Sequence, residues 1–259
     1  MQEFQQRIIA HRAPLEGEGV ARFASHVLTL LADRGTARRS EIRMDIVDRL
    51  TAAVIADDTP ALEALLRDMR LLRISAVVLA DHYIPEAARR MGEAWHQDRL
   101  GFAEVTIGSA RLQAMLRQIG QAWAADMASH PRGAILVIVP QGEQHTLGAL
   151  VVANQARRLG FTTRLLVGPQ LSAVSETLRD RRFDVALVSV AGDSVLENAG
   201  KLVETVRRSA SAALPVLVGG SVMSRRSDAA EVCGADAAFA DLGKGLHACG
   251  IATGVRETA

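Results

Sequence analysis

The feature that most constrains the fold of this 259-residue chain is a change of hydrophobic pattern near residue 130. Beyond it, a continuous apolar run occupies residues 134–139, and similar short β-rich runs follow at 163–167, 184–190, 215–218 and, more weakly, 237–239. Helical stretches separate these runs at 147–159, 172–181, 196–209 and 227–233. A strand that is buried on both faces has such an uninterrupted run. Strands that alternate with helices predict a flavodoxin-like, doubly wound parallel sheet.

The chain before residue 130 has a helical pattern instead, from about residue 20 to 127. Ile46, Leu50, Val54 and Ile55 recur at the spacing of a buried helical stripe. No strand pattern interrupts this half. The fold class that we predict is therefore α followed by α/β, with a bundle of four or five helices before the sheet.

Local signals divide the bundle into individual helices. Thr59 and Pro60 have the types favoured at a helix cap and first turn, and so predict a helix over 61–72. Ser75 is expected to cap the next helix, and Pro85 to kink or split it. A further helix is expected over 102–127. We expect a loose N-terminus at 1–16, a helical domain at 17–130, an α/β domain at 131–252 and a tail at 253–259.

Composition excludes several classes of protein. Hydrophobic residues make up 49% of the chain, which excludes a disordered protein, and the formal charge of +1 argues against a broad nucleic-acid-binding surface. The longest apolar run, 134–139, is too short to span a bilayer, and the first residues lack the pattern of an export signal. Cys233 and Cys249 cannot form a disulfide scaffold and are expected to be small buried side chains. We expect a soluble, cytoplasmic protein.

The loop after the first apolar run carries the residues of chemical interest. Ligands of doubly wound sheets bind beyond the carboxyl ends of the strands. Here the loop contains Glu143 and His145, with Gly142 and Gly148 allowing sharp backbone turns. A carboxylate that accepts Nδ1–H leaves Nε2 of an imidazole free as a metal ligand. The alternative is an ordinary solvated histidine in a polar loop.

Two further elements follow at the ends of later strands. Ser189 lies two residues before Ala191, and Gly219 and Gly220 form a pair. The order E-x-H-x-x-G, S-x-A, G-G resembles the cobalamin-binding domain, whose signature is D-x-H-x-x-G, S-x-L, G-G. Each element alone is more often ordinary, as a strand-end hydroxyl or a strand-exit turn, so the resemblance depends on their combination.

The resemblance implies a role for each residue. His145 would replace the dimethylbenzimidazole of the cofactor as the lower axial ligand to cobalt, and Glu143 would orient it. Ser189 would hydrogen-bond the displaced base. Gly219 and Gly220 would let the nucleotide tail pass close to the backbone. Ala191 stands in place of the usual Leu of the signature.

The helical half resembles the cap that covers the corrin in methionine synthase, corrinoid methyltransferase proteins and CarH photoreceptors. The similarity lies in residues 83–95, and it implies that Trp95 lies over the upper ligand. CarH places a Glu-His pair where this chain has Val105 and Thr106, with Glu104 one residue earlier. This departure favours water or hydroxide over adenosyl as the upper ligand.

Residues 83–113 and 142–148 together resemble the AerR/PpaA antirepressors of purple photosynthetic bacteria. This resemblance implies a light-responsive cobalamin-binding regulator that is not an enzyme. Its partner would be the repressor of photosystem genes called CrtJ or PpsR. Any contact with DNA would be indirect or non-specific, and no membrane would be involved.

Several alternatives stay open. The chain could be a corrinoid protein that carries methyl groups in a methyltransferase system, or a haem-binding sensor that uses His145. His82 and His96 lack ligand spacing to each other, so a second metal site is not expected. A basic cluster near the N-terminus is expected to be a solvated face, with a contact to DNA or an acidic protein as the alternative. Its members are Arg34, Arg38, Arg39 and Arg43.

Overall fold

The computed structural model describes residues 42–56, 58–126, 131–211 and 213–251. The chain forms two compact units that divide between Ile119 and Gly120, within helix α7 (Phe102–Asp126). This division lies before the predicted boundary at 130/131. The expected loose ends at 1–16 and 253–259 lie outside the described residues, as do Arg34, Arg38 and Arg39 of the basic cluster.

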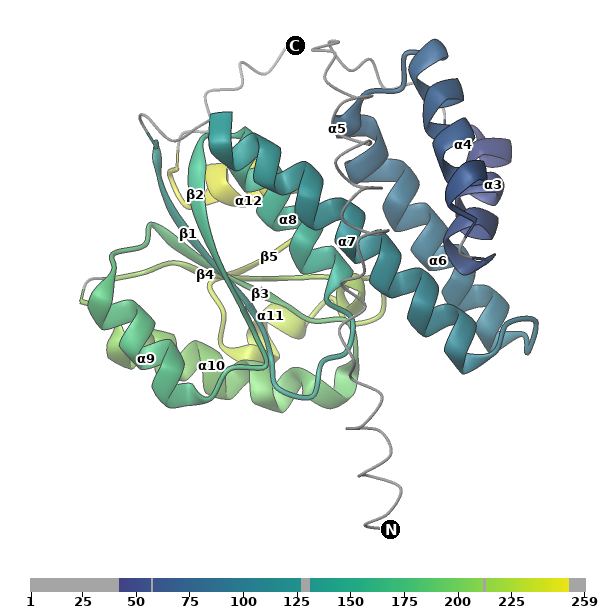
Figure 1. Cartoon of the computed structure of the whole chain (residues 1–259). Helices are drawn as coiled ribbons and strands as arrows, with labels where there is room; N and C mark the ends of the chain where they lie inside the picture. The colour runs from purple at the N-terminus through teal and green to yellow at the C-terminus, as the bar shows by residue number, and fades with distance from the viewer. Residues whose placement is uncertain (1–41, 57, 127–130, 212, 252–259) are drawn as a thin grey trace. The chain divides into compact units, whose positions relative to one another are not determined.

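The N-terminal unit is helical throughout its described part (Figure 1). It comprises α3 (Met44–Ala56), α4 (Thr59–Leu71), α5 (Ala76–Val78), the π-helical turn η1 (Leu79–Tyr83), α6 (Ile84–His96) and the first part of α7. The predicted stripe of α3 is confirmed at Ile46, Leu50 and Val54, which are each no more than 1% exposed, whereas its fourth member, Ile55, is only half-buried. The prediction of a helical bundle is confirmed with it.

The cap of α4 differs from the prediction by one residue. Thr59 is the first residue of the helix, and Asp58 is its N-cap. A carboxylate oxygen of Asp58 accepts from the backbone N–H of Ala61 at 2.8 Å, which satisfies one of the free amides of the first turn. The carboxylate thus takes the capping role that we predicted for the Thr59 hydroxyl, and Pro60 stays in the first turn.

Pro85 interrupts the next helix as predicted. Ser75 Oγ accepts from the Val78 N–H at 3.3 Å and begins α5, which confirms the predicted cap. The π-helical turn η1 then separates α5 from α6, and Pro85 stands in the first turn of α6. Proline has no N–H and crowds the preceding turn, so it is tolerated where one helical segment ends and another begins.

The C-terminal unit is the predicted α/β fold. Its elements are β1 (Gly133–Val139), α8 (Leu147–Arg158), β2 (Phe161–Val167), α9 (Leu171–Asp180), β3 (Val185–Ser189), η2 (Asp193–Val195), α10 (Leu196–Ser209), β4 (Val216–Gly219), η3 (Ser221–Ser224), α11 (Ala229–Cys233), β5 (Ala237–Phe239) and α12 (Leu242–Ala248). The strands form one parallel sheet in the order β2-β1-β3-β4-β5. This is the flavodoxin-like order.

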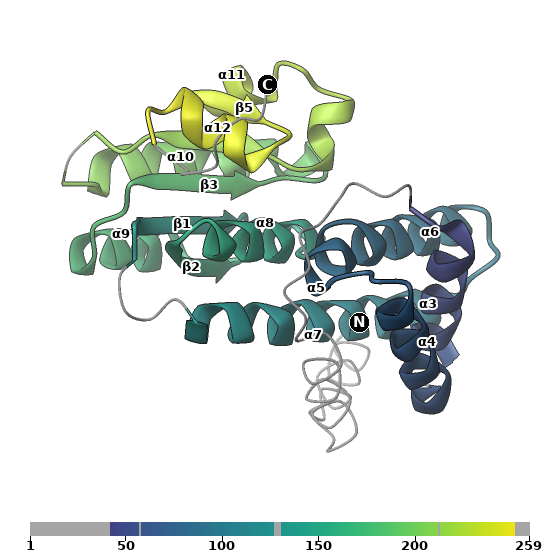
Figure 2. The ribbon, with the colours of Figure 1, turned by 90° about the horizontal axis from the view of Figure 1, so that it is seen from above.

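Helices cover both faces of this sheet (Figures 1 and 2). On one face α9, α10 and α11 pack against alternate strand residues such as Ile138, Val188 and Val218. On the other face α8 and α12 pack against Val137, Leu187 and Leu217. Alternate residues of a strand point to opposite faces, so each central strand must be apolar at every position. This explains the uninterrupted runs in the sequence.

The last turns of α7 pack against α8 within the C-terminal unit. A methyl group built at Gly120 would come within 2.0 Å of the side-chain oxygen of Asn154. The Arg158 guanidinium lies 4.5 Å from the ring centre of Trp123. These close contacts explain why the division between the units falls inside α7 and not after it.

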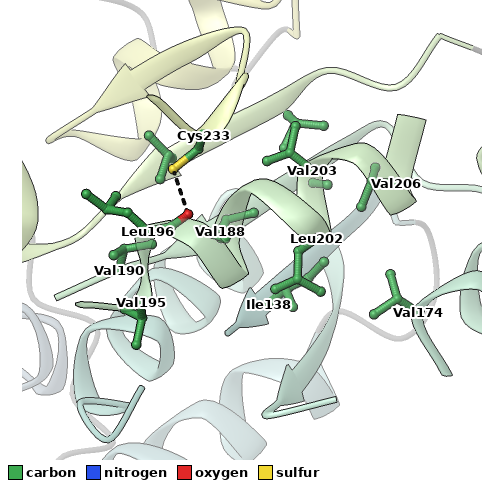
Figure 3. Close-up of a cluster of buried hydrophobic side chains, with 14 of the residues drawn as sticks. Ile138, Val174, Val188, Val190, Val195, Leu196, Leu202, Val203, Val206 and Cys233 are labelled. Atoms are coloured by element: carbon green, nitrogen blue, oxygen red, sulfur yellow. Dashed lines mark hydrogen bonds between the residues drawn. The ribbon is translucent and has the colours of Figure 1, made fainter. Parts of the chain in front are cut away.

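Cys233 has the buried position that we predicted. Figure 3 shows its sulfur pointing toward Leu196 at the start of α10, where Sγ lies 3.8 Å from the Leu196 carbonyl oxygen. Burial raises the pKa of this thiol. Cys249 is half-buried, and burial followed by the charge of Asp236 raises its pKa as well.

Candidate functional site

The order of the strands fixes where the site lies. β1 pairs with β2 on one side and with β3 on the other, so the direction of the connections reverses between β1 and β3. The loops that follow β1 and β3 diverge at this point, which is where doubly wound sheets bind ligands. The first loop carries Glu143 and His145, and the second carries Ala191 and Gly192.

Glu143 joins these two loops. Its Oε1 accepts from the backbone N–H of His145 at 2.8 Å and lies 2.8 Å from His145 Nδ1. Its Oε2 accepts from the backbone N–H of Ala191 at 2.8 Å and of Gly192 at 3.2 Å. One carboxylate therefore holds both its own loop and the loop after β3.

The environment of Glu143 keeps it ionised at neutral pH. Its side chain is only 2% exposed. Burial alone raises the pKa of a carboxyl group, but the hydrogen bonds from His145, Ala191 and Gly192 act in the opposite direction and leave the pKa of Glu143 below its usual value. A carboxylate that accepts several N–H bonds is stable in its charged form even where water is largely excluded.

His145 is presented outward by this contact. Its side chain is 76% exposed although its partner is buried. An ionised carboxylate can only accept, so Nδ1 of the neutral imidazole must carry the proton, and Nε2 then has its lone pair available. A histidine whose second nitrogen is held by a carboxylate is the usual arrangement of a metal ligand in proteins. The exposed ring can therefore bind a metal ion through Nε2, as one ligand at an open coordination position.

The turn before His145 is held at several points. Gly142 has a φ of +89°, a backbone conformation that side chains disfavour. The carbonyl of Gln141 accepts from the Asn198 side chain at 2.9 Å, and the Glu143 N–H donates to the carbonyl of Pro140 at 3.1 Å. The loop is thus shaped before any ligand arrives, and Asn198 is one of its anchors.

Gly148 and Ser189 face each other next to this loop. A methyl group built at position 148 would lie 4.0 Å from Ser189 Oγ. The Ser189 hydroxyl is half-buried and makes no hydrogen bond within the described part of the chain. Glycine at 148 therefore leaves the space in front of this hydroxyl free of a side chain. The predicted contact of Ser189 with a displaced base stays a prediction.

Gly219 and Gly220 are required by the protein's own packing. A methyl group at Gly219 would lie 2.6 Å from the Phe239 ring, and one at Gly220 would lie 2.2 Å from the carbonyl oxygen of Val190. Gly220 also has a φ of +115°. Because neither residue has a side chain, the end of β4 can pack closely against Phe239 and Val190. Their predicted role beside a nucleotide tail stays a prediction.

Trp95 lies near the end of α6 in the N-terminal unit. It is 45% exposed, and its ring centre is 5.6 Å from that of His96. Its predicted place over an upper ligand stays a prediction. Glu104 has a local role, because its Oε2 accepts from the Gly101 N–H at 2.7 Å at the start of α7. Among the described residues, no three His, Cys, Asp or Glu side chains gather as a metal site, and no helix could span a membrane.

The sequence analysis did not predict the contacts that Ala191, Gly192, Arg225 and the loop anchor Asn198 make in the site. The amides of Ala191 and Gly192 act through their backbone, so their side chains give no signal of this role. Arg225 lies beyond the Gly219–Gly220 pair, and its guanidinium donates to the Ala191 carbonyl at 2.5 Å. A basic residue soon after the glycine pair is the one signal that could have indicated a contact at this edge.

A five-stranded flavodoxin-like sheet with an outward histidine at its switch point belongs to the class of doubly wound folds that bind a ligand beyond the carboxyl ends of their strands, and its histidine can coordinate a metal ion in that ligand. Comparison with known proteins agrees with this class. Residues 133–247 match the B12 binding domain family. The monomethylamine corrinoid protein of Methanosarcina barkeri has the same fold, with a TM-score of 0.63 and 13% identity over 80% of this chain and 98% of its own.

A relative with much higher identity identifies the chain more closely. A protein of Rhodobacter capsulatus, described as an uncharacterized 20.5 kDa protein in the bchF-crtJ intergenic region, is 41% identical over 182 residues. The match covers 70% of this chain and 95% of the relative. The chain belongs to the family of this R. capsulatus protein, which is the AerR/PpaA family of cobalamin-binding proteins that its motifs resemble.

Proposed function

We propose that this protein binds cobalamin with His145 Nε2 as the lower axial ligand to cobalt, and that it acts as a light-responsive regulator. The observation that carries the proposal is the bond between Glu143 and His145 Nδ1 at the switch point of the sheet. When bound, cobalamin supplies a cobalt centre whose bond to its upper ligand is broken by light. The residues of the chain hold that centre and transmit the change.

Each residue of the site has one task in this proposal. Glu143 fixes the ring and the tautomer of His145, so that Nε2 faces the ligand with its lone pair. Gly148 leaves space beside the strand end, and the Ser189 hydroxyl offers a hydrogen bond to a base placed there. Gly219 and Gly220 have no side chains, so the nucleotide tail of the cofactor can pass close to the backbone at the end of β4.

Water or hydroxide is the upper ligand that we favour. Val105 and Thr106 stand where CarH photoreceptors have a Glu-His pair. Glu104 is held by the amide of Gly101, in the first turn of α7. Trp95 keeps its predicted role at the upper ligand in this proposal, and its ring, 45% exposed near the end of α6, is accessible for such a contact.

The regulatory part of the proposal is supported by the relative from R. capsulatus. The relative is described by its location between bchF and crtJ, and crtJ is the name of the repressor that the motif resemblance implies as partner. We propose that the protein relieves repression of photosystem genes by contacting a repressor of the CrtJ/PpsR type, without catalytic turnover. A ligand that biases two states of a protein is sufficient for such a switch.

Reconstitution of the full chain tests the cofactor and its ligand. Wild type, His145→Ala and His247→Ala are mixed with hydroxocobalamin or adenosylcobalamin in the dark and then illuminated. His247 is an exposed histidine in the last turn of α12 and serves as the matched control. We expect a corrinoid spectrum with histidine ligation in wild type and His247→Ala, and its loss in His145→Ala. An unchanged spectrum in His145→Ala would show that the ligand is wrong, and a haem spectrum in purified protein would favour the haem sensor.

A second experiment tests the regulatory role. Purified cobalamin-loaded protein is presented to an immobilised CrtJ-type repressor in the dark and after illumination, and in parallel to a corrinoid methyltransferase with its methyl donor. We expect light-dependent retention by the repressor and no methyl loading. Stoichiometric methylation with turnover and no retention by the repressor would favour the methyl carrier instead.

A further inference from the structure

Arg225 reaches from one loop of the carboxyl edge to another. It follows η3, which begins directly after Gly220. Its Nη2 donates to the carbonyl oxygen of Ala191 at 2.5 Å and also lies 3.6 Å from the carboxylate of Asp193. The loop after β4 is therefore joined to the loop after β3 by a cation on a backbone carbonyl, which is stronger than a neutral hydrogen bond.

The peptide that Arg225 contacts is also the peptide that holds Glu143. The Ala191 carbonyl and the Gly192 N–H belong to one peptide unit. Its carbonyl accepts from Arg225, and its N–H donates to Glu143 Oε2 at 3.2 Å. A donor on the carbonyl polarises the peptide and strengthens its N–H as a donor, by about 10–30% per bond in a chain of hydrogen bonds. The contact thus fixes both the position and the donor strength of this amide.

We propose that Arg225 is a positioning residue for the axial ligand His145, acting through the Ala191–Gly192 peptide and Glu143. This inference rests on the proposed function, because it assigns to Arg225 a role in holding His145 toward cobalt. The chain of contacts runs from the guanidinium to the peptide, from the peptide to Oε2, and from Oε1 to His145 Nδ1.

The neighbouring Arg226 shows what an arginine without this role looks like. It pairs with the carboxylate of Asp228, two residues away, at 2.8 Å. Such an exposed pair contributes little. Arg225 also lies 3.6 Å from the carboxylate of Asp193, but both side chains are about half-exposed, so this ion pair is weak. The shorter hydrogen bond from Arg225 to the Ala191 carbonyl is the contact that holds the loop after β3.

The first test uses the protein without cofactor, so it does not depend on cobalamin binding. Amide hydrogen exchange is measured at Ala191 and Gly192 in wild type, Arg225→Ala, Arg225→Lys and Arg226→Ala. We expect about three- to tenfold faster exchange at both amides in Arg225→Ala. Arg225→Lys should restore part of the protection, and Arg226→Ala should match wild type. The amides of β1 report in the same spectra that the fold is intact.

The second test uses the cobalamin-loaded protein. We expect Arg225→Ala to release hydroxocobalamin about three- to tenfold faster than wild type and to lose part of its histidine-ligated spectrum, with recovery in Arg225→Lys. Unchanged amides and an unchanged spectrum in Arg225→Ala, while Glu143→Gln alters both, would overturn the role of Arg225. Failure of the proposed function is a different result, in which His145→Ala itself leaves the spectrum unchanged.

Discussion

Replacement of Glu143 by Gln tests whether one carboxylate holds the two loops together. A carboxylate accepts at both oxygens, whereas an amide has one acceptor and one donor. If the glutamine NH₂ group faces Ala191 and Gly192, it meets the two backbone N–H groups that Oε2 now binds. If it faces His145, it meets the backbone N–H and can bond to Nδ1 only after the imidazole changes tautomer, which places the proton on Nε2. The substitution therefore removes two hydrogen bonds to a charged acceptor. The loops lie at the surface, so water can bond to part of the N–H groups that lose their partner, and this reduces the energetic cost. We expect a loss of about 2 kcal/mol from the free energy of unfolding of the C-terminal unit.

Native-state hydrogen exchange of the β1 amides measures this loss, because these amides exchange through opening of the C-terminal unit. A loss of about 2 kcal/mol corresponds to about 30-fold faster exchange at pH 7. Glu204→Gln is the matched control. Glu204 forms an exposed pair with Arg208 at 3.6 Å, so its loss should cost less than about 0.5 kcal/mol.

The same comparison has a defined pH dependence. The pKa of Glu143 is lowered in the folded protein, so its contribution is complete above the unfolded pKa of about 4.3 and is lost as the pH falls through the folded value. The gap between wild type and Glu143→Gln should therefore be present at pH 7 and shrink on acidification below about pH 4.3. A gap at pH 7 smaller than about 0.5 kcal/mol, or one that widens on acidification, would refute the reasoning.

Two further predictions concern local structure. Gly220→Ala should destabilise the C-terminal unit by about 3 kcal/mol, since it combines a φ of +115° with a methyl group 2.2 Å from the Val190 carbonyl oxygen. The control Gly168→Ala, with a φ of +58° and open space, should cost about 1 kcal/mol in the same exchange measurement, and equal losses would contradict the role of the Val190 contact. Asp58→Ala should remove the cap of α4 and cost about 1 kcal/mol, seen as faster amide exchange within α4 alone, and unchanged exchange there would show that the cap is not stabilising.

The fold could be predicted from the sequence because its signals are local and repeated. Short β-rich runs identified all five strands, and Pro85 identified the break between α5 and α6. The ends of elements were less accurate. Asp184 was expected in β3, but its carboxylate accepts from the Ala134 N–H at 2.7 Å and the strand begins one residue later. Helix α12 was missed, because Gly243 and Gly245 lower its helical propensity.

The site could be predicted only where side chains carry it. Glu143 and His145 lie two residues apart, and the structure joins them as predicted. The partners of Glu143 on the other loop are backbone amides, which any residue type provides. Arg225 comes from a third loop, and the contact between it and Ala191 depends on how the ends of β3 and β4 lie in space. Such contacts follow from strand order, which the sequence indicates only in outline.

The central claim is a bond between the His145 imidazole and cobalt, and electron paramagnetic resonance measures it directly. The full chain is produced with ¹⁵N-labelled histidine, loaded with cobalamin and reduced to the paramagnetic cobalt(II) state. If His145 is the axial ligand, the nitrogen splitting of the cobalt signal changes from triplets in unlabelled protein to doublets in labelled protein, and His145→Ala loses the doublets. Triplets that persist in the labelled protein would mean that the cofactor keeps its own base, and would contradict the account.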